Sequence, residues 1–155
     1  MKIKARLTIF SAILLLCQCN TKNKTPEQAA LPITGTWQLI SGTTIEKGDT
    51  TVTHYTANLS FIKIINDTHF AFLKHDLKKG KDSTAAFGSG GGGYTLKDSL
   101  YTEHLEYCSD REWEGNDFTF TITIQNDTLI QSGIEKVENA GINRINIERY
   151  ARVKN

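Results

Sequence analysis

A segment in the middle of the chain, Tyr101–Cys108, carries side chains that could do acid–base chemistry or hold a ligand. In an extended strand successive side chains point to opposite faces, so Tyr101, Glu103 and Tyr107 share one face with Leu105. We expect this face to point into the protein, because three of its four side chains are large and mostly apolar. Glu103 would then be a carboxylate in an apolar interior, where it needs a polar partner.

Three interpretations of Glu103 remain open from the sequence. Its carboxylate could anchor the polar head of a ligand, could form a structural pair with Arg149 or a tyrosine hydroxyl, or could face solvent. With a tyrosine or Arg149 beside it, Glu103 could also act as a general acid or base. The segment therefore predicts a polar position in the interior without deciding between binding and catalysis.

The opposite face of the same segment carries His104, Glu106 and Cys108. Residues two apart on a strand lie about 7 Å from one another, which is too far for shared metal coordination without other ligands. The sequence past residue 19 has no Gly-x-Ser-x-Gly, His-Glu-x-x-His or Cys-x-x-Cys motif. We therefore predict neither a metal site nor a cofactor, and the sequence leans against an enzyme.

The elements that must position these side chains are strands. Phe118–Ile124 alternates apolar residues with threonine, which predicts one buried and one exposed face. Similar turn tripeptides begin at Asn66, Lys97 and Asn126, and they interleave with longer breaks near residues 48, 80, 112 and 140. This alternation of turns predicts an up-and-down antiparallel sheet. Its eight strands are expected at approximately 35–46, 50–65, 68–77, 83–96, 100–108, 117–125, 129–137 and 143–153.

We expect this all-β domain to be an eight-stranded barrel, because closure removes exposed sheet edges; a β-sandwich is the alternative. A barrel of this size can be filled with side chains or can hold one small ligand. The longer breaks would border its mouth, where Trp113 could cover a ligand or cap the core. The other side chains expected to line a ligand are Phe70, Phe72, Tyr101, Glu103, Tyr107, Phe118 and Phe120.

Two further local features carry structural expectations. A three-residue loop at Asn126–Thr128 would place Phe120 opposite Ile134, and we prefer it because it matches apolar with apolar. A two-residue loop would instead place Phe118 opposite Glu135. The run Gly88–Gly93 lacks the Lys-Ser/Thr ending and the helix of a phosphate-binding loop, so we expect a bulge or a loose stretch of strand.

The start of the chain resembles an export signal. Three basic residues within the first six precede Leu7–Leu16, an uncharged and mostly apolar run of ten residues. This arrangement is typical of a signal peptide, and such a run is too short to cross a bilayer. We expect a signal peptide over residues 1–18, a flexible tether over 19–32 and one domain over 33–155.

Two cysteines, Cys17 and Cys19, lie where this signal would be cleaved, which resembles the lipoprotein signal of bacteria. We choose Cys19 as the acylated residue, because Gln18 ends the apolar run; a plain secretory signal is the alternative. Attached lipid chains would anchor the protein stably to a membrane. We therefore expect an exported envelope protein that faces the periplasm, or a secreted protein if it carries no lipid.

The charge balance excludes one class of partner. The 155-residue chain has a formal net charge of +1, and removal of residues 1–18 takes away three basic residues and no acidic one, which leaves −2. Neither value offers the basic footprint that nucleic acid requires.

The tripeptide Gly35-Thr36-Trp37 opens the first expected strand and resembles the signature of the lipocalin family. In that family the tryptophan plugs the closed end of the barrel, and an arginine late in the last strand packs against it. The resemblance implies these structural roles for Trp37 and Arg149, with Arg152 as the alternative partner. It implies no ligand residues, because the pockets of that family diverge.

Together these observations predict a lipocalin-like, envelope-anchored binding protein that holds a small apolar or amphipathic molecule and performs no chemistry. One alternative is a structural or interaction lipoprotein whose barrel is filled with side chains. A less favoured alternative is an enzyme that uses Glu103. A cavity larger than about 300 Å³ would favour the binding protein, and a filled interior the structural one.

Overall fold

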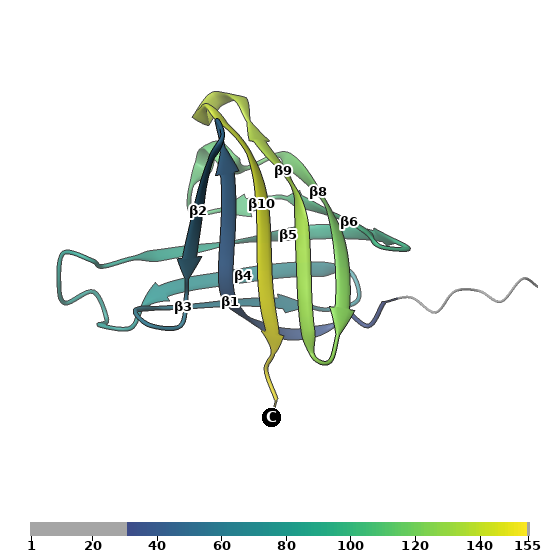
Figure 1. Ribbon diagram of the computed structural model, residues 1–155, viewed down its shortest axis with the longest axis horizontal. Helices are drawn as coiled ribbons and strands as arrows, with labels where there is room; N and C mark the ends of the chain where they lie inside the picture. Colours follow the sequence, from purple (N-terminus) through teal and green to yellow (C-terminus); the bar gives the residue numbers. More distant parts are fainter. Residues whose placement is uncertain (1–30, 155) are drawn as a thin grey trace, which may run out of the picture.

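The computed structural model describes residues 31–154, which form one antiparallel sheet (Figure 1). The expected signal peptide, the acylation site at Cys19 and most of the tether lie outside the described residues. Within this part of the chain, no helix has the length and apolar character needed to cross a bilayer. The elements are β1 (Gly35–Glu46), β2 (Asp49–His54), β3 (Leu59–Ile65), β4 (His69–Asp76), β5 (Phe87–Lys97), β6 (Leu100–Leu105), β7 (Tyr107–Cys108), η1 (Arg111–Trp113), β8 (Asn116–Gln125), β9 (Thr128–Val137), η2 (Glu138–Ala140) and β10 (Ile142–Arg152).

Eight of these strands close into an up-and-down barrel, which confirms the expected fold. Neighbours pair in the order β1, β3, β4, β5, β6, β8, β9 and β10, and β10 returns to pair with β1. Strands β2 and β3 are two halves of the expected strand 50–65, and they pair with the second and first halves of β1. In Figure 1, β3, β4 and β5 run across the view, whereas β1, β8, β9 and β10 run up it.

The hairpin between β8 and β9 is shorter than expected. Asn126 and Asp127 both have positive φ, 49° and 59°, and they form a two-residue turn that pairs Phe120 with Gly133. Such turns match the right-handed twist of the strands that they join. The expected three-residue loop, with Phe120 opposite Ile134, is therefore wrong. Ile134 lies on the outer face of β9 and is 62% exposed.

The closed end of the barrel is plugged by Trp37, which is fully buried. Its indole N–H donates a 2.7 Å hydrogen bond to the carbonyl of Ile33. The guanidinium carbon of Arg152 lies 4.0 Å from the centroid of this ring. The same guanidinium donates to the carbonyls of Thr34 at 2.8 Å and Pro32 at 2.7 Å, which ties the entering chain across the barrel end.

Arg149 does not take the role expected of it. It is exposed, whereas Asn146 and Tyr150 on the same strand are buried, so the even-numbered residues of β10 face the interior. Ile145 shares the phase of Arg149 and is 41% exposed. Arg152 shares the inward phase and lies at the strand end, beside Trp37, so it is the residue that packs there.

The apolar core extends from Trp37 at the closed end to Val137 at the other end of β9. Burial of each large apolar side chain stabilises the fold by about 1.5–3 kcal/mol relative to exposure. The fully or nearly buried members are Ile33, Trp37, Leu39, Ile65, Phe70, Tyr101, Leu105, Phe118, Phe120, Ile122, Leu129, Val137 and Tyr150. Four of these residues also line the cavity described next: Leu105, Phe118, Phe120 and Tyr150.

Candidate functional site

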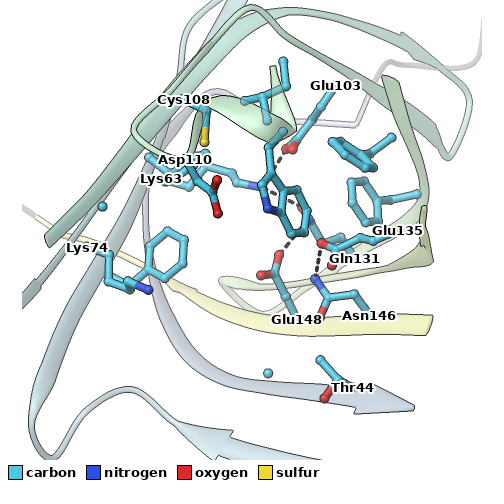
Figure 2. Close-up of a pocket in the computed structure, with 18 of the residues that line it drawn as sticks. Thr44, Lys63, Lys74, Glu103, Cys108, Asp110, Gln131, Glu135, Asn146 and Glu148 are labelled. Atoms are coloured by element: carbon cyan, nitrogen blue, oxygen red, sulfur yellow. Dashed lines mark hydrogen bonds and ion pairs between the residues drawn. The ribbon is translucent and has the colours of Figure 1, made fainter. Parts of the chain in front are cut away.

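The barrel encloses a cavity of about 450 Å³ next to this core (Figure 2). Side chains from most strands of the barrel line it, and Ser109, Asp110 and Trp113 from the β7–β8 connection contribute to its wall. The short helices η1 and η2 contact each other. The sequence predicted that the break near residue 112 borders the mouth of the barrel. The three cavity-lining residues from this connection are consistent with that prediction.

A buried ion pair lies at the deep side of the cavity. Lys63 on β3 is only 3% exposed, and its Nζ donates to Oε1 of Glu103 at 2.6 Å and to Oε1 of Gln131 at 3.1 Å. The ammonium also lies 5.8 Å from the ring centroid of Phe70 and 5.3 Å from that of Tyr150. A buried pair needs such additional partners, because removal of two charges from water can cost more than their attraction returns.

Gln131 connects this pair to a second carboxylate. Its Nε2 donates to Oε2 of Glu148 at 2.7 Å, and the hydroxyl of Tyr150 donates to the same oxygen at 2.7 Å. Both donors are neutral groups. Glu148 therefore receives hydrogen bonds that orient it, and it forms no salt bridge within residues 31–154.

A third carboxylate, Glu135 on β9, lies nearer the mouth. Its Oε2 accepts from Nε of Arg144 at 2.7 Å, and its Oε1 accepts from Nδ2 of Asn146 at 2.7 Å. The guanidinium of Arg144 also lies 5.5 Å from the ring centroid of Trp113, which in turn packs against Phe118 at 5.7 Å between centroids. These contacts link the mouth of the cavity to its polar wall.

The facing side of the cavity is aromatic. Tyr55 meets Phe61 edge to face with centroids 5.7 Å apart, and Phe61 lies 5.6 Å from Phe72. All three rings line the cavity. Aromatic rings opposite a set of oriented polar groups are the usual composition of a small-molecule site.

Burial and neighbouring charges shift the titration of these groups. Burial raises the pKa of Glu103 above its ordinary value, and the ammonium of Lys63 acts in the opposite direction. Burial likewise raises the pKa of Glu135, against the effect of Arg144. The pKa of Tyr150 is raised well above its ordinary value by burial and then by the charge of Glu148, so its hydroxyl remains a neutral donor.

Five of the residues predicted from the sequence to bind a ligand line the cavity: Phe72, Glu103, Trp113, Phe118 and Phe120. Phe70 and Tyr101 are buried in the core but are not part of the cavity wall. Within residues 31–154, the Tyr101 hydroxyl is the one buried side-chain polar atom without a hydrogen-bond partner. Whether any of these residues binds a ligand stays a prediction.

Tyr107 lies outside the barrel and is 68% exposed, so its expected inward position is wrong. Tyr94 pairs with Glu103, but Gly91 pairs with Tyr107, which leaves one extra residue between β6 and β7. This β-bulge reverses the facing of every residue after it. Cys108 consequently lines the cavity instead.

The glycine run of β5 faces this bulge. A Cβ atom on Gly92 would collide with the carbonyl oxygen of His104, so only glycine fits there. The expectation of a bulge or loose stretch at Gly88–Gly93 is wrong, because the run pairs residue by residue with β4 and the extra residue lies on the opposite strand, between β6 and β7. His104 points outward and bonds Asp117 at 2.8 Å, so the residues considered for a metal do not converge.

Several cavity residues were not expected from the sequence, namely Lys63, Gln131, Glu135, Arg144, Asn146 and Glu148. They lie on faces that apolar alternation assigned to the exterior, or in a strand that offered no clear alternation. Within the described residues, no group of three His, Cys, Asp or Glu side chains is placed to hold a metal ion. Comparison of this chain with protein-family models and with curated proteins finds no match.

Proposed function

We propose that this protein is a lipocalin-like binding protein that holds one small amphipathic molecule inside the barrel, without catalysis. The observation that carries this proposal is the cavity of about 450 Å³. Its size falls within the range of roughly 300–1,000 Å³ that is typical of ligand sites. A barrel used only as a scaffold would gain stability from a filled interior.

The two-sided lining supports an amphipathic ligand. The rings of Tyr55, Phe61 and Phe72 offer apolar contact, whereas the wall with Gln131 and Glu148 offers oriented polar groups. A ligand with an apolar body and a polar head would use both sides.

The N-terminal sequence supports a location for this binding. We propose that the protein is exported and anchored in the cell envelope by lipid on Cys19, with the barrel held at the end of a polar tether. An envelope position would give the cavity access to molecules outside the cytoplasm.

The test places a large side chain in the cavity by substitution of a residue of the barrel wall. Thr44 lines the cavity, whereas its neighbour Thr43 lies on the opposite face of β1. We expect the neutral fluorescent probe N-phenyl-1-naphthylamine to bind the full-length chain saturably, and Thr44→Trp to weaken it by about tenfold or more, because the indole occupies the same space. Thr43→Trp is the matched control and should leave binding unchanged. Absence of saturable binding, or equal loss in both variants, would contradict the proposal.

A further inference from the structure

Four of the seven charged side chains that line the cavity form two ion pairs. Lys63 pairs with Glu103 at 2.6 Å and Arg144 pairs with Glu135 at 2.7 Å. Glu148 forms no salt bridge within residues 31–154, although it lines the same cavity. The remaining two charged residues of the lining, Lys74 and Asp110, have opposite signs and form no salt bridge within residues 31–154; both lie on the left of the cavity in Figure 2. The lining as a whole thus carries one negative charge more than its positive charges balance.

Only one of the two carboxylate oxygens of Glu148 accepts hydrogen bonds from the described residues. Oε2 accepts from Gln131 and Tyr150, each at 2.7 Å, whereas Oε1 has no hydrogen-bond partner among the described residues. A carboxylate can accept about four hydrogen bonds, so this group has room for more donors. Both donors come from buried side chains, so they hold the carboxylate in one orientation in the cavity wall.

An aromatic surface begins directly beside this carboxylate. Glu148 pairs with Gly42 across the β1–β10 ladder. A Cβ on Gly42 would lie 3.3 Å from the ring of Tyr55, so this ring covers the place of the missing side chain. From Tyr55 the aromatic surface continues through Phe61 to Phe72. A group bound to Glu148 would therefore have apolar rings next to it, and such rings also attract positive charge.

The negative charge of Glu148 acts on several groups around the cavity. It contributes to the raised pKa values of Tyr55, Glu103 and Glu135, in each case after burial as the largest cause. Glu103 lies on β6 and Glu135 on β9, whereas Tyr55 lies in the connection between β2 and β3. The position of Glu148 is thus central, and a cation beside it would relieve unfavourable charge interactions with more than one neighbour.

We propose that the ligand of this cavity is an organic cation, a primary ammonium group on an apolar body, which donates to Oε1 of Glu148 and lies along Tyr55, Phe61 and Phe72. This inference rests on the proposed binding function and specifies its ligand class. A charge-assisted hydrogen bond to an oriented carboxylate supplies affinity and specificity together. Two of the three cations of the lining, Lys63 and Arg144, already bond to carboxylates, which leaves an anionic ligand fewer partners.

The experiment compares three indoles that differ in charge and share one apolar body: tryptamine, which is a cation at pH 7, the neutral tryptophol, and the anion indole-3-propionate. Binding to the full-length chain is measured by calorimetry. We expect tryptamine to bind about tenfold or more tightly than tryptophol, and indole-3-propionate to bind most weakly. Glu148→Gln keeps the shape and an acceptor for Gln131 and Tyr150, and it should remove the preference for tryptamine while tryptophol binding persists.

Glu112→Gln is the matched control, because it removes the same charge by the same substitution at an exposed residue that does not line the cavity. It should leave the preference for tryptamine in place, and an equal loss in both variants would overturn the assignment to Glu148. Equal or tighter binding of either other indole to the unchanged protein would overturn the inference alone, and so would failure of all three while N-phenyl-1-naphthylamine binds. Failure of that probe as well would remove the proposed function together with the inference. If Glu148→Gln does not fold, the ranking of the three indoles on the unchanged protein decides.

Discussion

Two adjacent strands of the barrel, β8 and β9, place different kinds of residue on the interior face at their centres. In β8 the apolar residues face the interior, where Phe118, Phe120 and Ile122 are all buried. In β9 the central interior positions are Gln131 and Glu135, while Ile134 lies outside. The β10 strand continues the pattern of β9, with Asn146 inside and Arg149 outside.

This difference divides the interior into an apolar wall and a polar wall. Polar groups are tolerated on the second wall because each interior one finds hydrogen-bond partners there, as in the Glu135–Asn146 and Gln131–Glu148 contacts. A continuous apolar interior would have packed more simply. The polar wall coincides with the cavity, so the departure from the usual pattern marks the place where a function is expected.

The largest effect should come from breaking the ion pair that joins the two walls. Lys63→Met leaves the Glu103 carboxylate buried without its cation, and loss of one partner from such a pair costs about 3–5 kcal/mol of unfolding free energy. Chemical denaturation of the full-length chain measures this. The double variant Lys63→Met/Glu103→Leu removes both charges and should recover most of the loss. If the double variant is as unstable as the single one, the pair is not what Lys63 contributes.

A second prediction tests the apolar alternation itself with one substitution at two positions. Ile122 on β8 is 1% exposed and Ile134 on β9 is 62% exposed. Ile122→Thr removes buried apolar surface and buries a hydroxyl, and it should cost about 2–4 kcal/mol. Ile134→Thr keeps a β-branched residue at an exposed site and should change stability by no more than about 0.5 kcal/mol. Similar losses for the two would mean that the facing of β9 is the reverse of that described.

The same two walls explain which features the sequence could predict. Turn residues and strand spacing were sufficient for the eight-stranded barrel, because Asn, Asp and Gly at the turns act locally. The plug at Trp37 was predicted from the resemblance of Gly35-Thr36-Trp37 to the lipocalin signature. The sequence did not predict which residues of β9 and β10 point into the barrel. The rule that apolar residues face inward fails on these strands, because their interior positions include polar residues.

The site was predictable only in part for two physical reasons. The β-bulge before Tyr107 adds a single residue, and its only sequence signal is the glycine run at Gly90–Gly93 on the facing strand. Lys63 lies between isoleucines in Phe61–Ile65, where nothing local indicates that its partner Glu103 is forty residues away in the chain. Pairings of this kind depend on the closed barrel and have no local signature.

The smallest effect is a dependence of stability on pH that should differ in sign between an interior and an exterior carboxylate. Burial raises the pKa of Glu135 above its ordinary value of 4.5, whereas the ammonium of Lys136 lowers the pKa of the exposed Glu138. A raised pKa in the folded state means that stability from this group is fully present below pH 4.5 and is lost as the pH rises through the folded value. A lowered pKa gives the opposite: stability is present above pH 4.5 and is lost as the pH falls through the folded value.

Two conservative variants isolate these contributions. The unfolding free energy of the unchanged protein minus that of Glu135→Gln should fall as the pH rises from about 4 to 7, because only the unchanged protein must ionise a buried group. The corresponding difference for Glu138→Gln should rise on going from the most acidic pH up to about 5, since the exterior ion pair forms as Glu138 ionises. Denaturation curves collected across this range measure both. If the difference in unfolding free energy for Glu135→Gln rises with pH instead, the effect of Arg144 on the pKa of Glu135 is larger than that of burial. The ionised carboxylate of the polar wall would then stabilise the folded state rather than destabilise it.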